Sequence, residues 1–316
     1  MPGYVLSLDG AGRDRVCFAM TALGAVPAAA VAADGAVVEA YVAAATGGPA
    51  APWAEIADPR RLQGALAEAV AEIMAHHGRR PAEAMPALMP GIAHRAHARQ
   101  RGRETETPVV LRSGLGAADV AEAASTIGYA RHFAVEDHRL RHRRFDGRMS
   151  QPIDRAVFAS GDAVTVLPFD PRRGTVLLIE QFRPGPYARR DPDPWCLEVV
   201  AGRCDGLEAP EETARREARE EAGLRLGRLE RIAGYYSTPG IAAEFITGFV
   251  GEADLGEAGG VHGLAVEDED IRALVVPVER ALAAVASGEV NNAPLLISLY
   301  WLDRHRARLT AAWADD

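Results

Sequence analysis

One stretch of 23 residues, 202–224, limits the possible folds and chemistry of this chain more than any other part of it. It has the pattern G-x5-E-x7-R-E-A-x-E-E-x-G-L. Because proline is favoured in the first turn of a helix and glycine just after the last, this stretch predicts a helix over 210–222. Ala209 stands at the N-cap position, where its side chain offers no acceptor.

Three glutamates of this predicted helix, Glu217, Glu220 and Glu221, share one face. At 100° per residue their side chains fall within an arc of about 100°. Like charges this close repel one another, and a set of oxygen ligands selects hard ions such as Mg2+, for which Mn2+ can substitute. The alternative is a solvated surface helix rich in Glu and Arg. The spacing of the three glutamates by itself leaves both interpretations open.

Composition and charge exclude several functional classes. The chain has 316 residues, enough for two domains, and is 48% hydrophobic and 25% charged, as in soluble globular proteins. A net charge of −9 argues against a general binder of nucleic acids or acidic membranes. The three cysteines form no C-x2-C pair, so we expect a reducing cytoplasm. The first residues lack the order of a signal peptide, and no stretch suits a membrane span.

The second half of the chain has the pattern of a mixed α/β protein. Two apolar runs, 163–169 and 175–182, are joined by D-P-R-R-G, which predicts a hairpin. Further strands are expected over 133–142, 156–159, 195–200, 229–236, 244–250 and 271–276, and helices over 278–287 and 293–309. This order favours an α/β (α+β) fold with a mixed β-sheet sandwiched between helices.

The first hundred residues indicate a smaller region of α/β or mostly helical structure. Residues 1–52 alternate short apolar runs with Gly and Pro, and helical spacing predicts helices over 59–78 and 81–101. These helices hold His76, His77, His94 and His97. No Cys or Glu stands at ligand spacing, so we expect exposed helix-end histidines rather than a metal site.

The pattern over 202–224 is the Nudix box, and residues from about 125 to 312 resemble the ADP-ribose pyrophosphatase branch of the Nudix hydrolases. Three further segments carry this resemblance: W-C-L-E-V-V-A-G, which enters the box, Y-S-T-P-G-I-A-A-E after it, and H-G-L-A-V-E-D-E-D-I further on. The branch marker, a proline sixteen residues past the last glycine of the box, is Pro239. The resemblance implies a Nudix fold and Mg2+-dependent hydrolysis of ADP-ribose to AMP and ribose 5-phosphate.

The resemblance also implies catalytic roles. The metal ligands would be the backbone carbonyl of Ala201 and the carboxylates of Glu217, Glu220, Glu221 and Glu269. Arg216 would orient Glu208 and steady the loop between them. Glu267 would act as the general base from a loop that closes over the site, with Glu220 also close to the reaction.

Substrate contacts follow from the same resemblance. Arg155 and Arg183 would bind the diphosphate or the nucleotide, and Glu244 would bind the ribose region. Where the family often stacks adenine on an aromatic ring, this chain has His132, which predicts weaker base affinity. Taken singly, the arginines suit surface ion pairs and the acidic run suits a solvated loop. Their joint placement around a complete box favours a site.

We divide the chain into an N-terminal region, 1–115, and a Nudix domain, 116–316. The resemblance extends to longer proteobacterial forms associated with tellurite resistance, whose extra N-terminal region begins with a gamma-glutamylcyclotransferase-like fold. The Tyr-Gly-Thr-Leu-type loop of that fold is absent here. We therefore interpret 1–115 as a degenerate remnant plus helices. By resemblance we also expect a homodimer that uses strands around 130–158.

Two other functions stay open. One is a pyrophosphatase for another nucleoside diphosphate sugar, such as a GDP- or UDP-sugar. The other is a non-catalytic Nudix protein that senses ADP-ribose, although such proteins often lose box glutamates and this chain keeps them all. In each case the partner is a small molecule, with no nucleic acid and no membrane.

Overall fold

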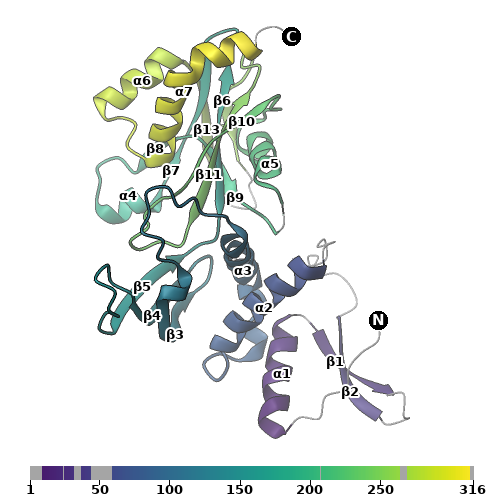
Figure 1. Ribbon diagram of the computed structural model, residues 1–316. Coiled ribbons are helices and arrows are strands. Elements are labelled where there is room, and N and C mark those ends of the chain that lie inside the picture. The colour runs from purple at the N-terminus through teal and green to yellow at the C-terminus, as the bar shows by residue number, and fades with distance from the viewer. Residues whose placement is uncertain are drawn as a thin grey trace. The chain divides into compact units, whose positions relative to one another are not determined.

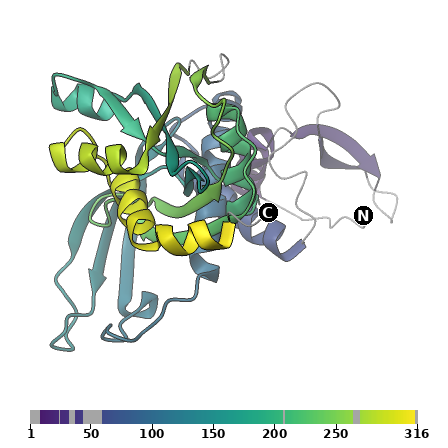
Figure 2. The same cartoon turned by 90° about the horizontal axis from the view of Figure 1, so that it is seen from above.

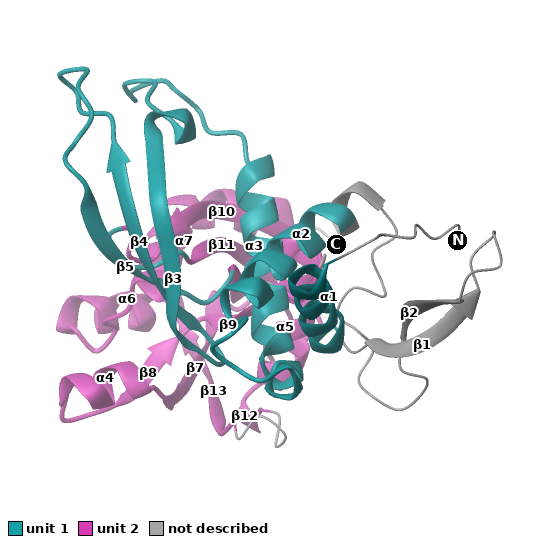
Figure 3. Ribbon diagram, turned by 90° about the horizontal axis from the view of Figure 1, so that it is seen from below, with its two compact units in different colours: residues 1–161, 240–243 teal, residues 162–239, 244–316 magenta. Residues whose placement is uncertain are grey.

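The computed structural model describes residues 9–23, 25–31, 37–43, 59–206, 208–263 and 269–313 (Figure 1). Contacts divide the chain into two compact units, coloured separately in Figure 3. Unit 1 holds residues 1–161 and 240–243, and unit 2 holds 162–239 and 244–316. None of the helices described is long and apolar enough to cross a membrane.

Unit 2 is built on an eight-stranded mixed sheet. Its strands are β6 (Ala163–Asp170), β7 (Thr175–Phe182), β8 (Trp195–Glu198), β9 (Val200–Arg203), β10 (Leu229–Tyr236), β11 (Phe245–Glu252), β12 (Gly260–His262) and β13 (Ile271–Pro277). The main path runs β10-β11-β6-β7-β13-β12, and only the β11–β6 pair is parallel among the pairs of this sheet.

The two central strands, β6 and β7, separate soon after their shared turn. They pair only where Phe169 faces Val176 and Asp170 faces Thr175. Beyond that point β9 pairs with the first half of β6, and β8 pairs with the second half of β7. Because one residue separates β8 from β9, this arrangement places the start of the box against the middle of the sheet.

The predicted hairpin between β6 and β7 is confirmed, and the side chain of Asp170 holds its turn. Oδ1 accepts the backbone N–H groups of Arg172 at 2.9 Å and Arg173 at 3.0 Å. Oδ2 accepts the backbone N–H of Leu255 at 3.1 Å and Nη1 of Arg173 at 2.6 Å. Burial opposes the charged form, but these hydrogen bonds lower the pKa of Asp170.

Helices cover both faces of the sheet, so the predicted mixed sheet between helices is confirmed. Helix α5 (Pro210–Ala222) packs on one face through a core that includes Val164, Leu177 and Phe249. Helices α6 (Val278–Ser287) and α7 (Ala293–Trp313), drawn at the yellow end of the colour range in Figure 2, cover the other face. Helix α7 contacts β11, β6 and β8. The short helix α4 (Pro184–Arg189), between β7 and β8, was not predicted.

Unit 1 combines helices with two small antiparallel sheets. Its elements are α1 (Gly10–Ala22), β1 (Ala25–Val31), β2 (Val37–Ala43), α2 (Pro59–Ala75), α3 (Met89–Glu104), β3 (Val120–Ala130), β4 (Ala134–His142) and β5 (Ile153–Ala159), with short 3-10 turns at Ala82–Ala84, Pro86–Leu88 and Ala117–Asp119. Helix α3 begins later than the sequence predicts, because the 3-10 turns take up residues 82–88.

A chain of ion pairs links the helices of unit 1 to its three-stranded sheet. Glu72 of α2 accepts Arg95 of α3 at 2.5 Å and Arg99 at 2.9 Å, and Arg99 also pairs with Glu136 of β4. The side chains of Glu72 and Arg95 are each 1% exposed. Residues 59–104 therefore share contacts with the strands over 120–159, and the compact unit ends near residue 161. The functional division at residues 115 and 116 stays a prediction.

Two histidines, His76 just after α2 and His97 in α3, differ from expectation. His76 and His97 are 3% and 1% exposed, so the prediction of exposed helix-end side chains is wrong for both. Burial lowers both pKa values, that of His97 to about 4. The reason is tertiary: α2 and α3 pack against each other and cover these faces. Among the described residues no group of His, Cys, Asp or Glu side chains forms a metal site.

Candidate active site

Helix α5 begins and ends where the local signals place it. Pro210 is in its first turn, and Gly223 ends it with φ of 65°, a left-handed conformation that favours glycine. Ala209 makes no side-chain cap, but its backbone N–H donates to Glu212 Oε2 at 3.0 Å. Ala214, Ala218 and Ala222 are buried in the core below the helix. This close packing brings the glutamates of α5 against β9.

Glu221 is the most buried carboxylate of the box, at 3% exposure. Its Oε2 accepts the backbone N–H of Ala201 at 2.9 Å. Burial raises the pKa of Glu221 to about 8, and the charges of Glu217 and Glu269 add to the rise. The Ala201 hydrogen bond and the charge of Arg183 oppose it. A carboxylate in this position is costly to ionise unless a cation joins it.

Glu217 lies one turn before Glu221 and directly against Gly202. A Cβ atom at position 202 would lie 1.8 Å from Glu217 Oε1, so only glycine leaves room for this carboxylate. The side chain of Glu217 is 13% exposed. Burial raises its pKa to about 7, although Arg216 opposes the rise. The first glycine of the box thus creates the space in which a box glutamate sits.

Arg216 makes hydrogen bonds to several parts of the box. Its Nη1 donates to Glu217 at 2.6 Å and to Glu220 at 2.9 Å. Its Nη2 donates to Glu208 at 3.2 Å and to the carbonyl of Arg203 at 3.1 Å. The structure therefore places Arg216 against Glu208, as expected from the resemblance, and links the loop before α5 to the glutamates on the helix.

The box glutamates do not by themselves form a closed metal cage. No three carboxylate, His or Cys side chains in the described part of the chain converge on a common point. Instead, Glu217 and Glu220 turn to Arg216, and Glu221 turns to Ala201. This donor set still fits a hard divalent ion, because Mg2+ is usually held by one or two carboxylates together with water and substrate phosphate.

Arg183 and Glu198 form a second charged group on unit 2. Arg183 Nε donates to Glu198 Oε2 at 2.6 Å. Burial raises the pKa of Glu221, and the positive charge of Arg183 opposes this rise. The guanidinium of Arg183 therefore lies within electrostatic range of the box. The sequence-based prediction included Arg183 but missed Glu198. A glutamate at the end of the short apolar strand W-C-L-E is the signal that could have found it.

The remaining predicted residues lie in different parts of the structure. Glu244 accepts a hydrogen bond from Ser237 Oγ at 2.8 Å, and Pro239 lies in the same loop, both in unit 2. Arg155 on β5 and His132 before β4 belong to unit 1. Glu269 lies within electrostatic range of Glu221. Glu267 lies outside the described residues.

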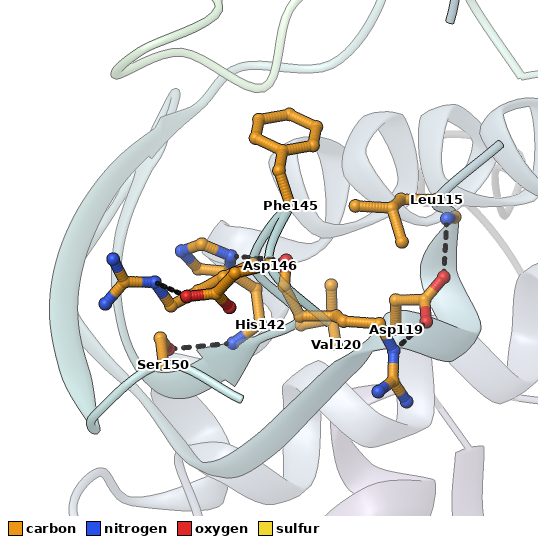
Figure 4. Close-up of a pocket in the computed structure, with 10 residues that line it drawn as sticks. Leu115, Asp119, Val120, His142, Phe145, Asp146 and Ser150 are labelled. Carbon is orange, nitrogen blue, oxygen red and sulfur yellow. Dashed lines mark hydrogen bonds and ion pairs between the residues drawn. The ribbon is translucent and has the colours of Figure 1, made fainter. Parts of the chain in front are cut away.

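A large surface cavity of about 740 Å³ lies elsewhere, in unit 1 (Figure 4). Its charged groups are satisfied locally. Asp119 accepts Arg143 Nε at 2.7 Å, Asp146 accepts Arg148 Nη2 at 2.7 Å, and Ser150 Oγ accepts the backbone N–H of His142 at 3.0 Å. Size alone therefore does not identify the reactive site, and the charge pattern points to the box.

Comparisons with known proteins agree with this location. The family model of the NUDIX domain matches residues 159–297. The chain is 43% identical over 200 residues to "ADP-ribose pyrophosphatase" of Escherichia coli strain K12, which covers 63% of this chain and 95% of that relative. It is 36% identical over 189 residues to the protein of the same name from Haemophilus influenzae, covering 58% of this chain and 86% of the relative.

Two further likenesses are more distant. "GDP-mannose pyrophosphatase" of Enterobacter sp. strain 638 is 36% identical over 151 residues, covering 47% of this chain and 76% of that relative. A solved structure described as "Crystal structure of ADP compounds hydrolase" aligns with a TM-score of 0.48 at 18% identity, over 64% of this chain and 99% of the other.

Proposed function

This chain belongs to the Nudix hydrolase family, and from that premise we propose that it hydrolyses the diphosphate bond of ADP-ribose to AMP and ribose 5-phosphate. The observation that carries the proposal is the pair of Glu217, which is partly buried, and Glu221, which is buried, both held by a complete box against β9. The relatives named ADP-ribose pyrophosphatase align with a larger share of this chain than the GDP-mannose pyrophosphatases do. Their sequence identity to this chain is equal or higher.

The residues on α5 suit a divalent metal ion, which we propose is Mg2+ with Mn2+ as a substitute. Glu217, Glu220 and Glu221 would hold it, together with the carbonyl of Ala201 and with Glu269. When bound, such an ion neutralises diphosphate charge and lowers the pKa of bound water. The raised pKa values of Glu217 and Glu221 support this assignment, because a cation would stabilise their charged forms.

The other box residues would organise this cluster. Arg216 shares its guanidinium between Glu208 and the glutamates Glu217 and Glu220. Release of Glu217 and Glu220 toward a cation would leave Arg216 bound to Glu208. The loop before α5 therefore stays attached while the carboxylates change partners. We propose that Glu220 also lies close to the reaction, directly or through water.

Substrate binding is assigned to residues around the box. We propose that Arg183 donates to the diphosphate, where two terminal nitrogens can meet phosphate oxygens. Glu244 would accept hydrogen bonds from the ribose region, beside Pro239. The assignments of Arg155 to the diphosphate or the nucleotide, of His132 to adenine and of Glu267 to the general base stay predictions from the family resemblance.

Several properties of the whole protein stay proposals as well. We propose a homodimer that uses strands around 130–158, a cytoplasmic location and a small-molecule substrate as the main partner. Residues 1–115 would be a region without its own catalysis, and 116–316 the Nudix domain. Any connection with tellurite resistance would act indirectly, through the level of ADP-ribose.

A hydrolysis panel tests the proposed function. The protein would be incubated with ADP-ribose, GDP-mannose and a UDP-sugar, with Mg2+ or with EDTA, and the products would be identified by mass. We expect AMP and ribose 5-phosphate, formed only with metal. Faster turnover of another sugar nucleotide would favour the alternative pyrophosphatase. Tight binding of ADP-ribose without turnover of any substrate would favour a sensor.

A further inference from the structure

Arg183 and Glu198 are brought together by the β7–β8 pair. Arg183 follows the last residue of β7, and its backbone N–H donates to the carbonyl of Pro194 at 2.9 Å. This bond joins the two ends of the connection over 184–194. The register places Ile179 opposite Glu198. Opposite residues share a face of a sheet, and Ile179 belongs to the core beneath α5. Glu198 therefore faces the side that carries the box.

The contact between the two side chains is specific to one edge of the guanidinium. Glu198 Oε2 accepts Nε at 2.6 Å. Among the described residues, no protein group accepts a hydrogen bond from the terminal nitrogens of Arg183. The side chain of Arg183 is 39% exposed, whereas that of Glu198 is 18% exposed. The carboxylate of Glu198 is thus mostly shielded from solvent, while the guanidinium of Arg183 stays accessible.

A carboxylate at position 198 must be partly desolvated, which is unfavourable if its role is only structural. Burial raises the pKa of Glu198, and Arg183 together with a hydrogen bond from the side chain of Gln181 only partly opposes that rise. An apolar side chain at this position would avoid the desolvation of a carboxylate. A reason to place the carboxylate here is the orientation of the arginine that it holds.

We propose that Glu198 is a positioning residue for hydrolysis: it fixes Arg183 through Nε and leaves both terminal nitrogens to donate to the diphosphate. The inference rests on the proposed function, in which Arg183 binds that diphosphate. Two parallel N–H donors match phosphate oxygens in a defined geometry, which depends on the orientation of the guanidinium plane. An arginine fixed before binding also loses less conformational freedom when the substrate arrives.

Steady-state kinetics on the full chain with ADP-ribose and saturating Mg2+ test this. We expect Glu198→Ala to lower kcat/KM on the order of 10- to 100-fold, with a raised KM, because the diphosphate donor is no longer held in place. Glu198→Gln keeps an acceptor oxygen and should recover part of the loss. In an Arg183→Ala background, Glu198→Ala should change kcat/KM little, because its target is gone.

The matched control is Glu180→Gln. Glu180 lies on β7 and pairs with Arg272 at 2.7 Å, and its position on the strand places it on the opposite face from Ile179. Loss of the Glu180 charge should change kcat/KM by less than about twofold, because exposed ion pairs contribute little free energy.

Three outcomes would overturn the positioning role. One is wild-type kinetics in Glu198→Ala. Another is an equal loss with and without the Arg183 side chain. The third is a lower kcat at unchanged KM that follows the loss of folded protein in thermal melting. If Glu198→Ala does not fold, Glu198→Gln and its double variant with Arg183→Ala decide the same question. A wild-type protein inactive on ADP-ribose would contradict the proposed function itself, and this inference with it.

Discussion

The backbone N–H of Ala201 donates to the carboxylate of Glu221 at 2.9 Å. This bond joins β9 to α5 and holds an almost fully buried carboxylate against the backbone of Ala201. One oxygen of Glu221 is satisfied by the protein, yet burial still disfavours its charge. The arrangement gives Glu221 a fixed position and a reason to bind a cation.

Replacement of Glu221 by Gln should nearly abolish turnover. The amide keeps the shape but cannot neutralise a metal ion, and metal assistance contributes several kcal/mol, so we expect a loss of about 1000-fold or more in kcat/KM. The far-UV circular dichroism spectrum should not change. Glu211→Gln, an exposed position on the same helix, serves as the control and should remain fully active. Unchanged turnover in Glu221→Gln would refute the metal assignment.

The metal-free protein should lose stability as the pH rises from about 5 to 8. The folded-state pKa values of Glu217 and Glu221 are about 7 and about 8, against an ordinary value of 4.5. Between these values the folded state keeps protons that the unfolded state has released, so the free energy of unfolding decreases with pH. The decrease should be a few kcal/mol, since one pKa unit corresponds to about 1.4 kcal/mol.

Urea unfolding at several pH values in EDTA measures this effect. Added Mg2+ should remove much of the slope, because it binds the charged carboxylates of the folded state. The variant Glu221→Gln should show a shallower slope in EDTA. A flat pH profile for the metal-free wild type would show that these two glutamates are already ionised in the folded state.

Gly202→Ala should impair metal use more than folding. The new methyl group would occupy the place of the Glu217 carboxylate. Because that carboxylate ends a flexible side chain, it can move aside at little cost in stability. We therefore expect a higher Mg2+ concentration for half-maximal activity, by about tenfold, and a small change in melting temperature. Gly185→Ala is the control, since a methyl group there meets no neighbour. Equal Mg2+ dependence in the two variants would contradict the steric role.

Asp170→Asn should destabilise unit 2 by about 1–3 kcal/mol, because a neutral amide replaces a buried carboxylate that accepts four hydrogen bonds. Since the pKa of Asp170 is lowered in the folded state, its contribution is present above pH 4 and is lost as the pH falls through the folded pKa. Urea unfolding at pH 7 and at acidic pH measures both effects. Asp254→Asn, at an 82% exposed partner of Arg173, should have a much smaller effect.

Glu72→Gln should destabilise unit 1. It removes the negative charge that faces two arginines, one of them fully buried, and breaking a buried pair costs about 3–5 kcal/mol. Hydrogen exchange should show faster exchange in both α3 and β4, because Arg99 connects them. Glu83→Gln, at an exposed position, should leave both protected. Faster exchange in α3 alone would show that the ion-pair chain does not couple the helices to the sheet.

Local sequence signals determined the elements around the site. Pro210 and Gly223 define α5, D-P-R-R-G defines the hairpin between β6 and β7, and the spacing of Glu217 and Glu221 places both on one face. These features depend on backbone geometry over a few residues, so they can be predicted from the sequence. The family pattern likewise identified Arg216 and Glu208 as neighbours, and the structure places them in contact.

Tertiary packing decided what these side chains experience. Helical spacing shows which residues share a face, but not what covers that face, so it could not show that Glu221 is buried against β9 or that His97 lies inside unit 1. Helical spacing also could not show that Glu198 contacts Arg183. The two residues are fifteen positions apart in the sequence, and the pairing of β7 with β8 brings them together. Charge and pKa depend on burial and on neighbours distant in sequence, and only the folded chain supplies both.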